Sequence, residues 1–189
     1  MKNQRINTRT LTGVAIFTAI VVVLQLLGSF IRFGTFSISL VLIPIVVGAA
    51  MYGVGAGAWL GFVFGLTVLL SGDAALFLGV NAFGAVLTVL AKGALAGLCA
   101  GLVYKALEGK NRWLAVIAAA VACPVVNTGI FLVGCNLFFM DTIKEWAGGT
   151  NVGVFMITGL VGLNFVFEML VNIVLSPVVL RLIKIGKKS

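Results

Sequence analysis

Long runs of apolar residues, each about as long as a bilayer is thick, follow one another along this chain. The run GAVLTVLAKGALAGLCAGLVY, residues 84–104, has Lys92 as its one charged residue. As an α-helix such a run crosses the hydrocarbon core of a bilayer, which takes about 20 apolar residues. Apolar residues make up 61% of the chain and charged residues only 10%, too few to cover a soluble surface. The sequence therefore predicts an all-α membrane protein.

Six such runs are separated by charged residues and by short stretches rich in Gly, Ser or Asn. The second contains Pro44 and meets the third at the turn MYGVGAG, whose glycines accept positive φ, so these two are expected to form a tight hairpin. The first is too long for a cleaved signal peptide and lacks a cleavage site, so it is expected to remain. We predict a six-transmembrane-helix bundle forming one integral membrane domain over residues 1–189. The expected spans are 10–29, 37–52, 55–71, 84–104, 114–138 and 155–183.

Basic residues cluster before the first span, between the fourth and fifth, and after the sixth. An even number of spans places these segments on one side of the membrane, and cytoplasmic segments are enriched in Lys and Arg. Both termini are therefore predicted to be cytoplasmic. The net charge of +8 follows from this topology and requires no nucleic acid as a partner. The clusters consist of Lys2, Arg5, Arg9, Lys105, Lys110, Arg112, Arg181, Lys184, Lys187 and Lys188.

The sequence lacks the residue groups on which many membrane enzymes depend. It has no histidine, and its five acidic residues form no D-x-x-D or H-E-x-x-H motif. The cysteines Cys99, Cys123 and Cys135 are odd in number and lie in or beside the spans, so they are expected to be small packing residues without a disulfide framework. We therefore expect no catalytic activity, no metal and no cofactor.

Small residues recur at every fourth position on three of the spans. Two of these stripes lie on the third and fourth spans, and such spacing lets helix backbones approach closely. They are expected to pack against residues of the same chain. A third, Ala15 and Ala19 near the cytoplasmic end of the first span, is a candidate for contact with a partner. The first two stripes are Gly57, Gly61 and Gly65, and Gly93, Gly97 and Gly101.

Polar residues of the last three spans lie at similar depths. Lys92 is about 12 Å below the outer end of the fourth span, and two polar residues continue its face towards the outside. One asparagine of the fifth span and two polar residues of the sixth reach the level of Lys92. Polar groups from three helices at one depth predict a cavity. The expected substrate-binding residues are Asn81, Thr88, Lys92, Asn127, Asn164 and Glu168.

Two explanations account for a lysine at this depth, where a lone ammonium costs at least about 2.5–3.5 kcal/mol. In one, Lys92 and Glu168 form a buried salt bridge that asparagines satisfy, and no ligand is involved. In the other, Lys92 orients an anionic or polar ligand from outside, while Asn127 and Asn164 supply amide donors and acceptors. The two overlap, because a salt bridge can open to admit a carboxylate. A lipid-facing or packing role is the default expectation for the aromatic residues near the outer ends, and covering an organic ligand is the alternative; these residues are Phe77, Phe83 and Phe138.

The chain resembles the S component of an energy-coupling factor (ECF) vitamin transporter over nearly its whole length. The resemblance rests on the span count, on the segments LTGVAIFTA (11–19) and IPIVVGAAMYGVGAGAWLGFVFG (43–65), and on the polar residues of the last three spans. It implies a substrate-binding subunit in a prokaryotic plasma membrane that captures a vitamin-like molecule outside. The chain has no Walker motif, so a transmembrane T component and two ATPase subunits would energise transport.

The resemblance also implies roles for particular residues. In this family an A-x-x-x-A pair on the first helix packs against the coupling helices of the T component, and Ala15 and Ala19 match that pair in spacing and depth. The ligand is held in an outward-facing pocket of the last three spans, and the protein topples in the membrane to release it inside. Lys92 favours a ligand with a carboxylate, and pantothenate is the first candidate.

Two other classes of function stay open. A self-sufficient secondary transporter usually has an internal repeat or broken helices, and no convincing correspondence relates the first three spans to the last three. An accessory structural subunit needs no ligand, which leaves the stripe of Asn164, Glu168 and Asn172 without a purpose beyond helix association. A vitamin retained on purification favours the binding subunit, whereas ion-driven uptake by the protein alone favours the secondary transporter.

Overall fold

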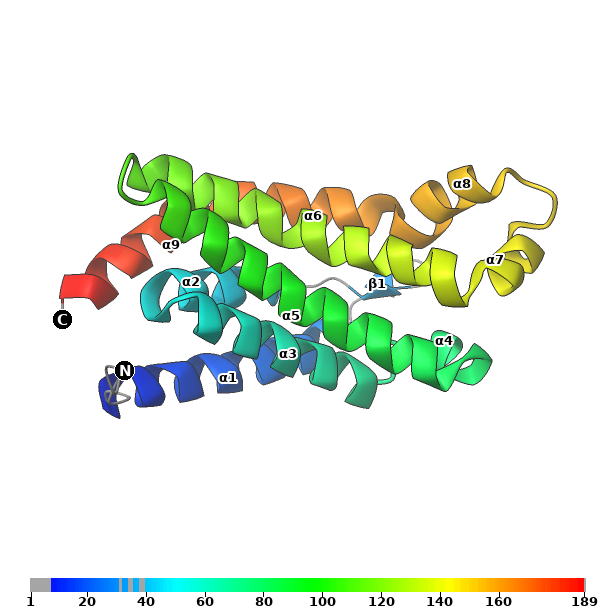
Figure 1. Cartoon of the computed structure of the whole chain (residues 1–189), viewed down its shortest axis with the longest axis horizontal. Helices are drawn as coiled ribbons and strands as arrows, with labels where there is room; N and C mark the ends of the chain where they lie inside the picture. Colours follow the sequence, from blue (N-terminus) through cyan, green and yellow to red (C-terminus); the bar gives the residue numbers. More distant parts are fainter. Residues whose placement is uncertain (1–7, 31, 34–35, 38–39, 189) are drawn as a thin grey trace, which may run out of the picture.

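The computed structural model describes residues 8–30, 32–33, 36–37 and 40–188, which form an elongated bundle of helices (Figure 1). In this part of the chain the only sheet is an antiparallel pair of two-residue strands, β1 (Arg32–Phe33) and β2 (Phe36–Ser37). The helices are α1 (Thr8–Ser29), α2 (Leu42–Tyr52), α3 (Val54–Leu70), α4 (Ala75–Val80), α5 (Ala82–Leu107), α6 (Arg112–Phe138), α7 (Met140–Ala147), α8 (Val152–Phe155), the π-helical η1 (Met156–Val161) and α9 (Gly162–Lys188).

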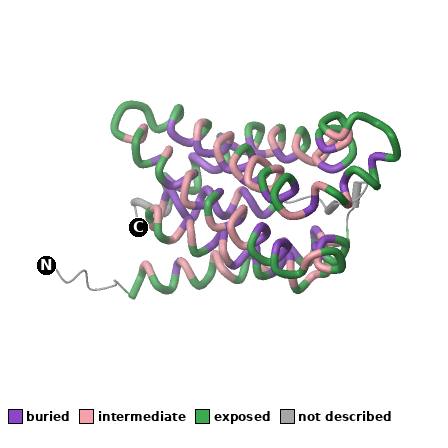
Figure 2. The backbone as a smooth tube through the Cα atoms, turned by 45° about the vertical axis from the view of Figure 1, so that its right-hand side comes forward, coloured by how far each residue is buried: buried purple, intermediate pink, exposed green. Residues whose placement is uncertain are grey.

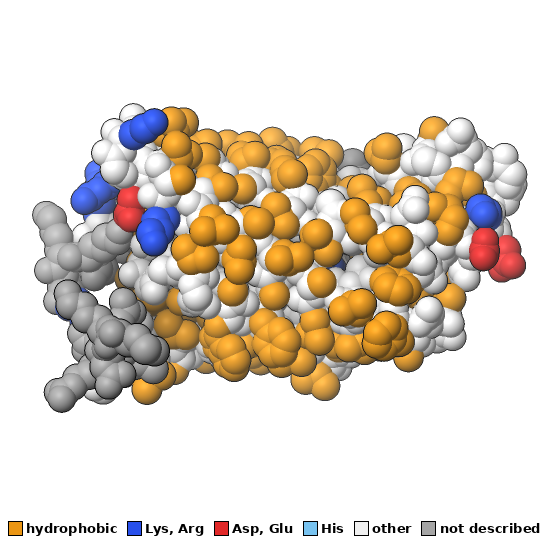
Figure 3. All heavy atoms as spheres, in the orientation of Figure 1, with side chains coloured by type: hydrophobic (Ala, Val, Ile, Leu, Met, Phe, Trp, Pro, Cys, Tyr) orange, Lys and Arg blue, Asp and Glu red, His pale blue; other side chains and the backbone are white. Residues whose placement is uncertain are grey.

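Four of the described helices, α1, α5, α6 and α9, are long and apolar enough to cross a membrane. Figure 3 shows apolar side chains spread over the middle of the face in view and charged side chains at its two ends. These features confirm the predicted all-α membrane protein. The count of six spans stays a prediction, because α3 has 17 residues and α2 has 11, which correspond to lengths of about 25 Å and about 16 Å.

The second predicted span, 37–52, is helical only from Leu42, so the prediction of helix at its start was wrong. Ser37 lies in β2, and Pro44 lies in the first turn of α2, where the missing N–H of a proline removes no helical hydrogen bond. Most residues of α2 are buried, as expected for a helix that is apolar all round and enclosed by other helices. Gly53, at φ 97°, makes the predicted tight turn into α3.

Helices α3 and α5 pack backbone to backbone through the two glycine stripes. A Cβ atom at Gly57 would lie 2.5 Å from the carbonyl oxygen of Gly97, and one at Gly61 would collide with the carbonyl oxygen of Gly93. Only glycine permits so close an approach of two helices. The predicted packing within the chain is confirmed.

The last predicted span, 155–183, is not one continuous α-helix, contrary to the prediction. The π-helical turn η1 ends at Val161, and Gly162 follows with φ 41° and ψ −139°. Positive φ is readily adopted by glycine because it has no Cβ atom. Residues before Gly162 therefore form a separate short segment, and α9 begins at Gly162 itself.

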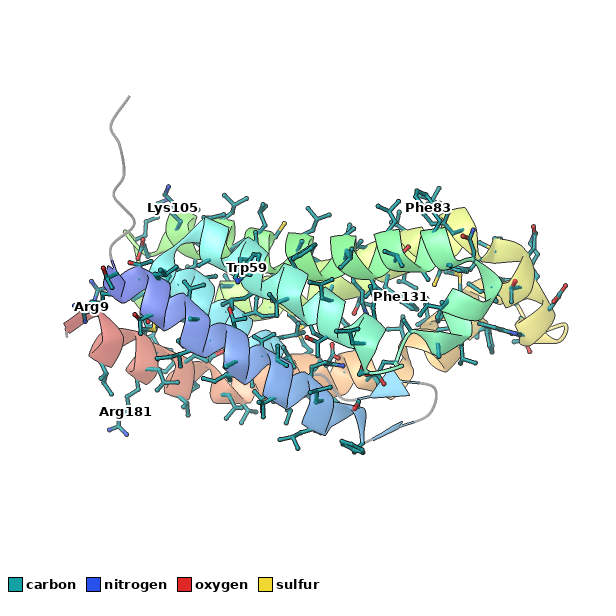
Figure 4. All side chains as sticks on the ribbon, turned by 90° about the horizontal axis from the view of Figure 1, so that it is seen from below. Arg9, Trp59, Phe83, Lys105, Phe131 and Arg181 are labelled. Carbon is teal, nitrogen blue, oxygen red and sulfur yellow. The ribbon has the colours of Figure 1, made fainter. Side chains whose placement is uncertain are left out.

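The two ends of the bundle differ in charge and structure. Arg9, Lys105 and Arg181 lie at one end and Phe83 at the other (Figure 4). The predicted basic residues Lys2 and Arg5 lie outside the described residues. The end near Phe83 carries two short helices that the sequence did not predict, α4 and α7 (Figure 1). Helix α7 is amphipathic, since its apolar face is buried in the bundle while an exposed ion pair lies on its other face.

Buried residues line the inner faces of the helices (Figure 2) and form two hydrophobic clusters. The larger cluster includes Phe64 and Cys123, and the smaller includes Phe77, Cys135 and Phe139 near the end with α4 and α7. Both of these cysteines are free thiols and fully buried, which confirms the packing role predicted for them. The core of the bundle therefore consists of two hydrophobic clusters, one after the other along its length.

Candidate functional site

A cavity of about 90 Å³ lies between the two hydrophobic clusters, because residues of both line it. Its wall includes Phe131, which lies in the half of the bundle remote from the labelled basic residues (Figure 4). This position agrees with the depth that the sequence predicts. The predicted substrate-binding residues that line the cavity, all from α5, α6 and α9, are Thr88, Lys92, Asn127, Asn164 and Glu168.

Asn81 is the predicted residue that does not line this cavity. Its side-chain oxygen accepts a 2.9 Å hydrogen bond from the backbone N–H of Gly84 and so caps α5. Asparagine is favoured there because the first N–H groups of a helix have no partner within it. The prediction from depth was therefore wrong for Asn81, whose place just before an apolar run is typical of a cap.

The ammonium group of Lys92 lies between two aromatic rings. Its Nζ atom is 5.9 Å from the ring centroid of Phe64 and 5.5 Å from that of Phe131. At such distances the electron-rich faces of the rings attract a cation. The salt bridge of Lys92 with Glu168 stays a prediction. Glu168 and Asp73 line the same cavity as Lys92.

Several buried polar atoms in the cavity wall have no hydrogen-bond partner among the described residues. Each such atom costs about 1–3 kcal/mol if nothing binds it. The cavity that their residues line has several times the room that one water molecule needs. The unpartnered atoms in the wall are Gln25 Oε1, Thr88 Oγ1, Asn127 Oδ1 and Asn164 Oδ1.

Comparison with known families agrees with this arrangement of helices and cavity. The family model of the substrate-specific component of ECF transporters matches residues 9–180, which is most of the chain. The chain belongs to this family. Neither the curated proteins nor the solved structures gave a match. The resemblance seen in the sequence is thus confirmed. This S component is a substrate-binding membrane subunit of a transporter, and its family is not a family of enzymes.

The polar stripe on α9 of the S component faces the bundle interior as predicted. Asn164 and Glu168 line the cavity. Asn172, one turn further along, is buried outside it, and its side-chain nitrogen donates a 2.7 Å hydrogen bond to the backbone oxygen of Glu168. The stripe therefore consists of two residues that line the cavity and one residue whose side chain forms a hydrogen bond within its own helix.

Aromatic rings cover the cavity on the side of the short helices. Phe77 of α4 lines the cavity and stands edge-on to Phe131, Phe139 and Trp146 at centroid distances of 5.6, 4.9 and 5.7 Å. Of the three candidate covering residues, only Phe77 has this position. Phe83 is 73% exposed on the outer surface, and Phe138 packs against Gly84. These positions agree with the default lipid-facing or packing role expected for these two rings.

Sequence reasoning missed three polar residues of the cavity, which are Gln25, Asp73 and Thr128. Gln25, on α1, donates a 2.8 Å hydrogen bond from Nε2 to Oδ2 of Asp73, in the turn between α3 and α4. Ser71 also donates to that carboxylate oxygen, at 3.3 Å. An amide within the apolar run VVVLQLLG was a usable signal for Gln25, since polar residues inside spans usually face the interior. Asp73 carried no such signal, because it falls between two apolar segments.

The predicted docking residues Ala15 and Ala19 both lie on the exposed side of α1. Other positions of this helix contact the bundle: a Cβ at Gly13 would collide with the ring of Tyr52, and Thr18 accepts a 3.1 Å hydrogen bond from Trp59 Nε1. Neither alanine is needed for packing within the chain. Both are therefore accessible to a partner helix.

Proposed function

We propose that this S component binds a small, carboxylate-bearing vitamin or vitamin precursor in the cavity around Lys92 and delivers it inward together with a T component and two ATPase subunits. Pantothenate is the first candidate. The observation that carries the proposal is an ammonium group, Lys92, in a cavity whose wall contains unpartnered polar atoms. The carboxylate of such a molecule would bind the ammonium group, and the hydroxyl and amide groups of the molecule would form hydrogen bonds with the polar wall.

The cost of burying charge supports a use for Lys92 beyond stability. A buried ion pair is weak evidence for stabilisation because desolvation offsets much of its attraction. Here the Lys92 ammonium lies over the rings of Phe64 and Phe131, which attract its charge without forming full hydrogen bonds with its N–H groups. A ligand carboxylate would form charge-assisted hydrogen bonds with those donors, which are stronger than bonds between neutral groups.

The bound molecule itself tests this proposal. Native mass spectrometry of the protein purified from its host is expected to show one small molecule retained, and fragmentation is expected to identify a carboxylic acid. Binding of radiolabelled pantothenate by the purified protein checks the first candidate directly. A protein that arrives empty and binds no vitamin carboxylate would contradict the proposal.

A self-sufficient secondary transporter is the second candidate, because the helix is interrupted at Gly162 beside the cavity. Interrupted helices at a substrate site are typical of that class. Proteoliposomes that contain only this chain separate the two candidates. Uptake driven by an ion gradient would favour the secondary transporter, whereas uptake that needs the T component, the ATPases and ATP would favour the proposal.

We further propose that the basic end of the bundle faces the cytoplasm, which places both termini there. Arg9, Lys105 and Arg181 support this orientation because positive charge marks cytoplasmic segments. In a variant without native cysteines, Asn3→Cys and Lys110→Cys are expected to resist membrane-impermeant thiol reagents in intact cells, and Thr150→Cys to react. The reverse labelling pattern would overturn the orientation. Thr150 and Lys110 suit the test because both are exposed.

A further inference from the structure

We propose that Gln25 is a substrate contact of this S component and that the contact connects the substrate to the helix that carries the docking residues. The proposal rests on the proposed function, since it concerns the same cavity. In it, the amide oxygen of Gln25 accepts a hydrogen bond from a hydroxyl or N–H group of the substrate. The sequence predicted no substrate-binding residue on α1.

The burial of Gln25 contrasts with that of its helix. In the apolar window of α1, 17% of residues are buried, against 33–39% in the other three long helices. Gln25 itself is only 1% exposed and reaches the cavity wall. A long polar side chain that is directed inward from the most peripheral of these helices needs a partner inside, because an unsatisfied buried amide is costly.

The hydrogen bond to Asp73 fixes which end of the amide is left without a partner. The nitrogen and oxygen of a glutamine amide are distinguished by the partners that each contacts. A carboxylate oxygen accepts hydrogen bonds, so the group 2.8 Å from Asp73 Oδ2 is the donor Nε2. The oxygen Oε1 is therefore the free end, and it has no hydrogen-bond partner among the described residues.

The free end of the amide specifies the chemistry of the group that binds it. A carbonyl oxygen only accepts, so the substrate must present a donor such as a hydroxyl or an N–H group. The ammonium group of Lys92, which lines the same cavity, can only donate hydrogen bonds, so the substrate must also present an acceptor. The site therefore suits a molecule that carries a carboxylate and, apart from it, at least one donor.

Gln25 and the docking residues lie on one rigid element. Ala15 is ten residues from Gln25, or about 15 Å along the axis of α1. Polar contacts that join α1 to other helices and turns include the bond of Thr18 to Trp59 and that of Gln25 to Asp73. A substrate bound to Oε1 adds another, at the end of α1 away from the docking residues. Substrate binding is therefore expected to restrict the motion of the helix that the T component contacts.

The test compares Gln25→Met with a matched control. The methionine keeps the length of the side chain and removes the amide. In the control, Thr67→Val, the lost hydroxyl is also buried, but it bonds only to the backbone oxygen of Val63 and does not line the cavity. Affinity is measured by equilibrium dialysis with radiolabelled pantothenate, or with whichever other molecule native mass spectrometry finds bound. We expect Gln25→Met to weaken binding about 3- to 10-fold, the effect of one neutral hydrogen bond, and Thr67→Val to bind like the parent.

Hydrogen exchange of α1 supplies a readout that a purely structural role would not change. At saturating substrate, amides of residues 19–29 are expected to exchange more slowly than in the empty parent protein. Gln25→Met is expected to remove this difference even when fully bound, and Thr67→Val to keep it. If Gln25→Met matches the parent in affinity and in protection, while Lys92→Met still weakens binding, the inference fails and the proposed function stands. If the parent binds nothing, both fail.

Discussion

Transport by the complete ECF complex is expected to be lost when Ala15 or Ala19 is replaced by tryptophan, while substrate binding by the isolated S component stays nearly unchanged. Both alanines are exposed on α1, so a large ring there disturbs no packing within the chain. A ring at either position would keep a partner helix from the close approach that small residues allow. Uptake into proteoliposomes with T component and ATPases measures the first effect, and equilibrium dialysis measures the second.

Leu27→Trp is the matched control for this prediction. Leu27 is also on α1 and is 58% exposed, but it is not on the line of Ala15 and Ala19. Transport by the Leu27→Trp variant is expected to match that of the parent. Equal losses of binding and transport in the alanine variants would mean that the pair serves the fold of the S component and is not a docking surface.

Replacing Lys92 with methionine is expected to weaken binding of a carboxylate substrate by about 1.5–3 kcal/mol, or about 10–150-fold. The variant keeps the side-chain length and removes the charge. Folding is expected to survive, because a thioether packs well between the rings of Phe64 and Phe131. Isothermal titration with pantothenate, or with the carboxylate identified by mass spectrometry, measures the change.

Two comparisons show whether the lost affinity comes from the charge. A neutral analogue in which an alcohol replaces the carboxylate is expected to lose much less affinity on Lys92→Met. Glu168→Gln is expected to leave carboxylate binding unchanged or tighter, because it removes an anion from the same cavity. A Lys92→Met protein that folds normally and binds the carboxylate as tightly as the parent would make Lys92 a structural cation only.

The sequence was most informative where a physical requirement, such as the length of a membrane span, can be met by only one kind of structure. Apolar runs of membrane length predicted the long helices, and glycines at every fourth residue predicted the backbone contact between α3 and α5. Charge inside a span predicted a polar cavity on the last three spans, since Lys92 and Glu168 cannot face lipid. These features depend on composition and helical spacing, which a single sequence contains.

The features that the sequence did not predict depend on how elements meet. The contribution of α1 to the cavity depends on the distant turn that brings Asp73 to Gln25, 48 residues away. The Lys92 ammonium lies over rings from α3 and α6, and helix depth alone does not reveal which rings meet it. The break at Gly162 was not predicted, because a glycine in an apolar run is as compatible with a continuous membrane helix as with an interruption.

The shortness of α2 has a consequence for how the protein is made. A helix of 11 residues cannot cross the hydrocarbon core alone, and its preceding backbone includes a two-residue strand. Non-helical backbone at membrane depth is tolerated only where other protein surrounds it. As the ribosome delivers the chain, α2 therefore has no stable place in lipid until α3 and the later helices enclose it. Biogenesis of this subunit must end with the completion of a bundle around α2, and a nascent chain stalled before α5 and α9 would leave that helix as a substrate for membrane quality control.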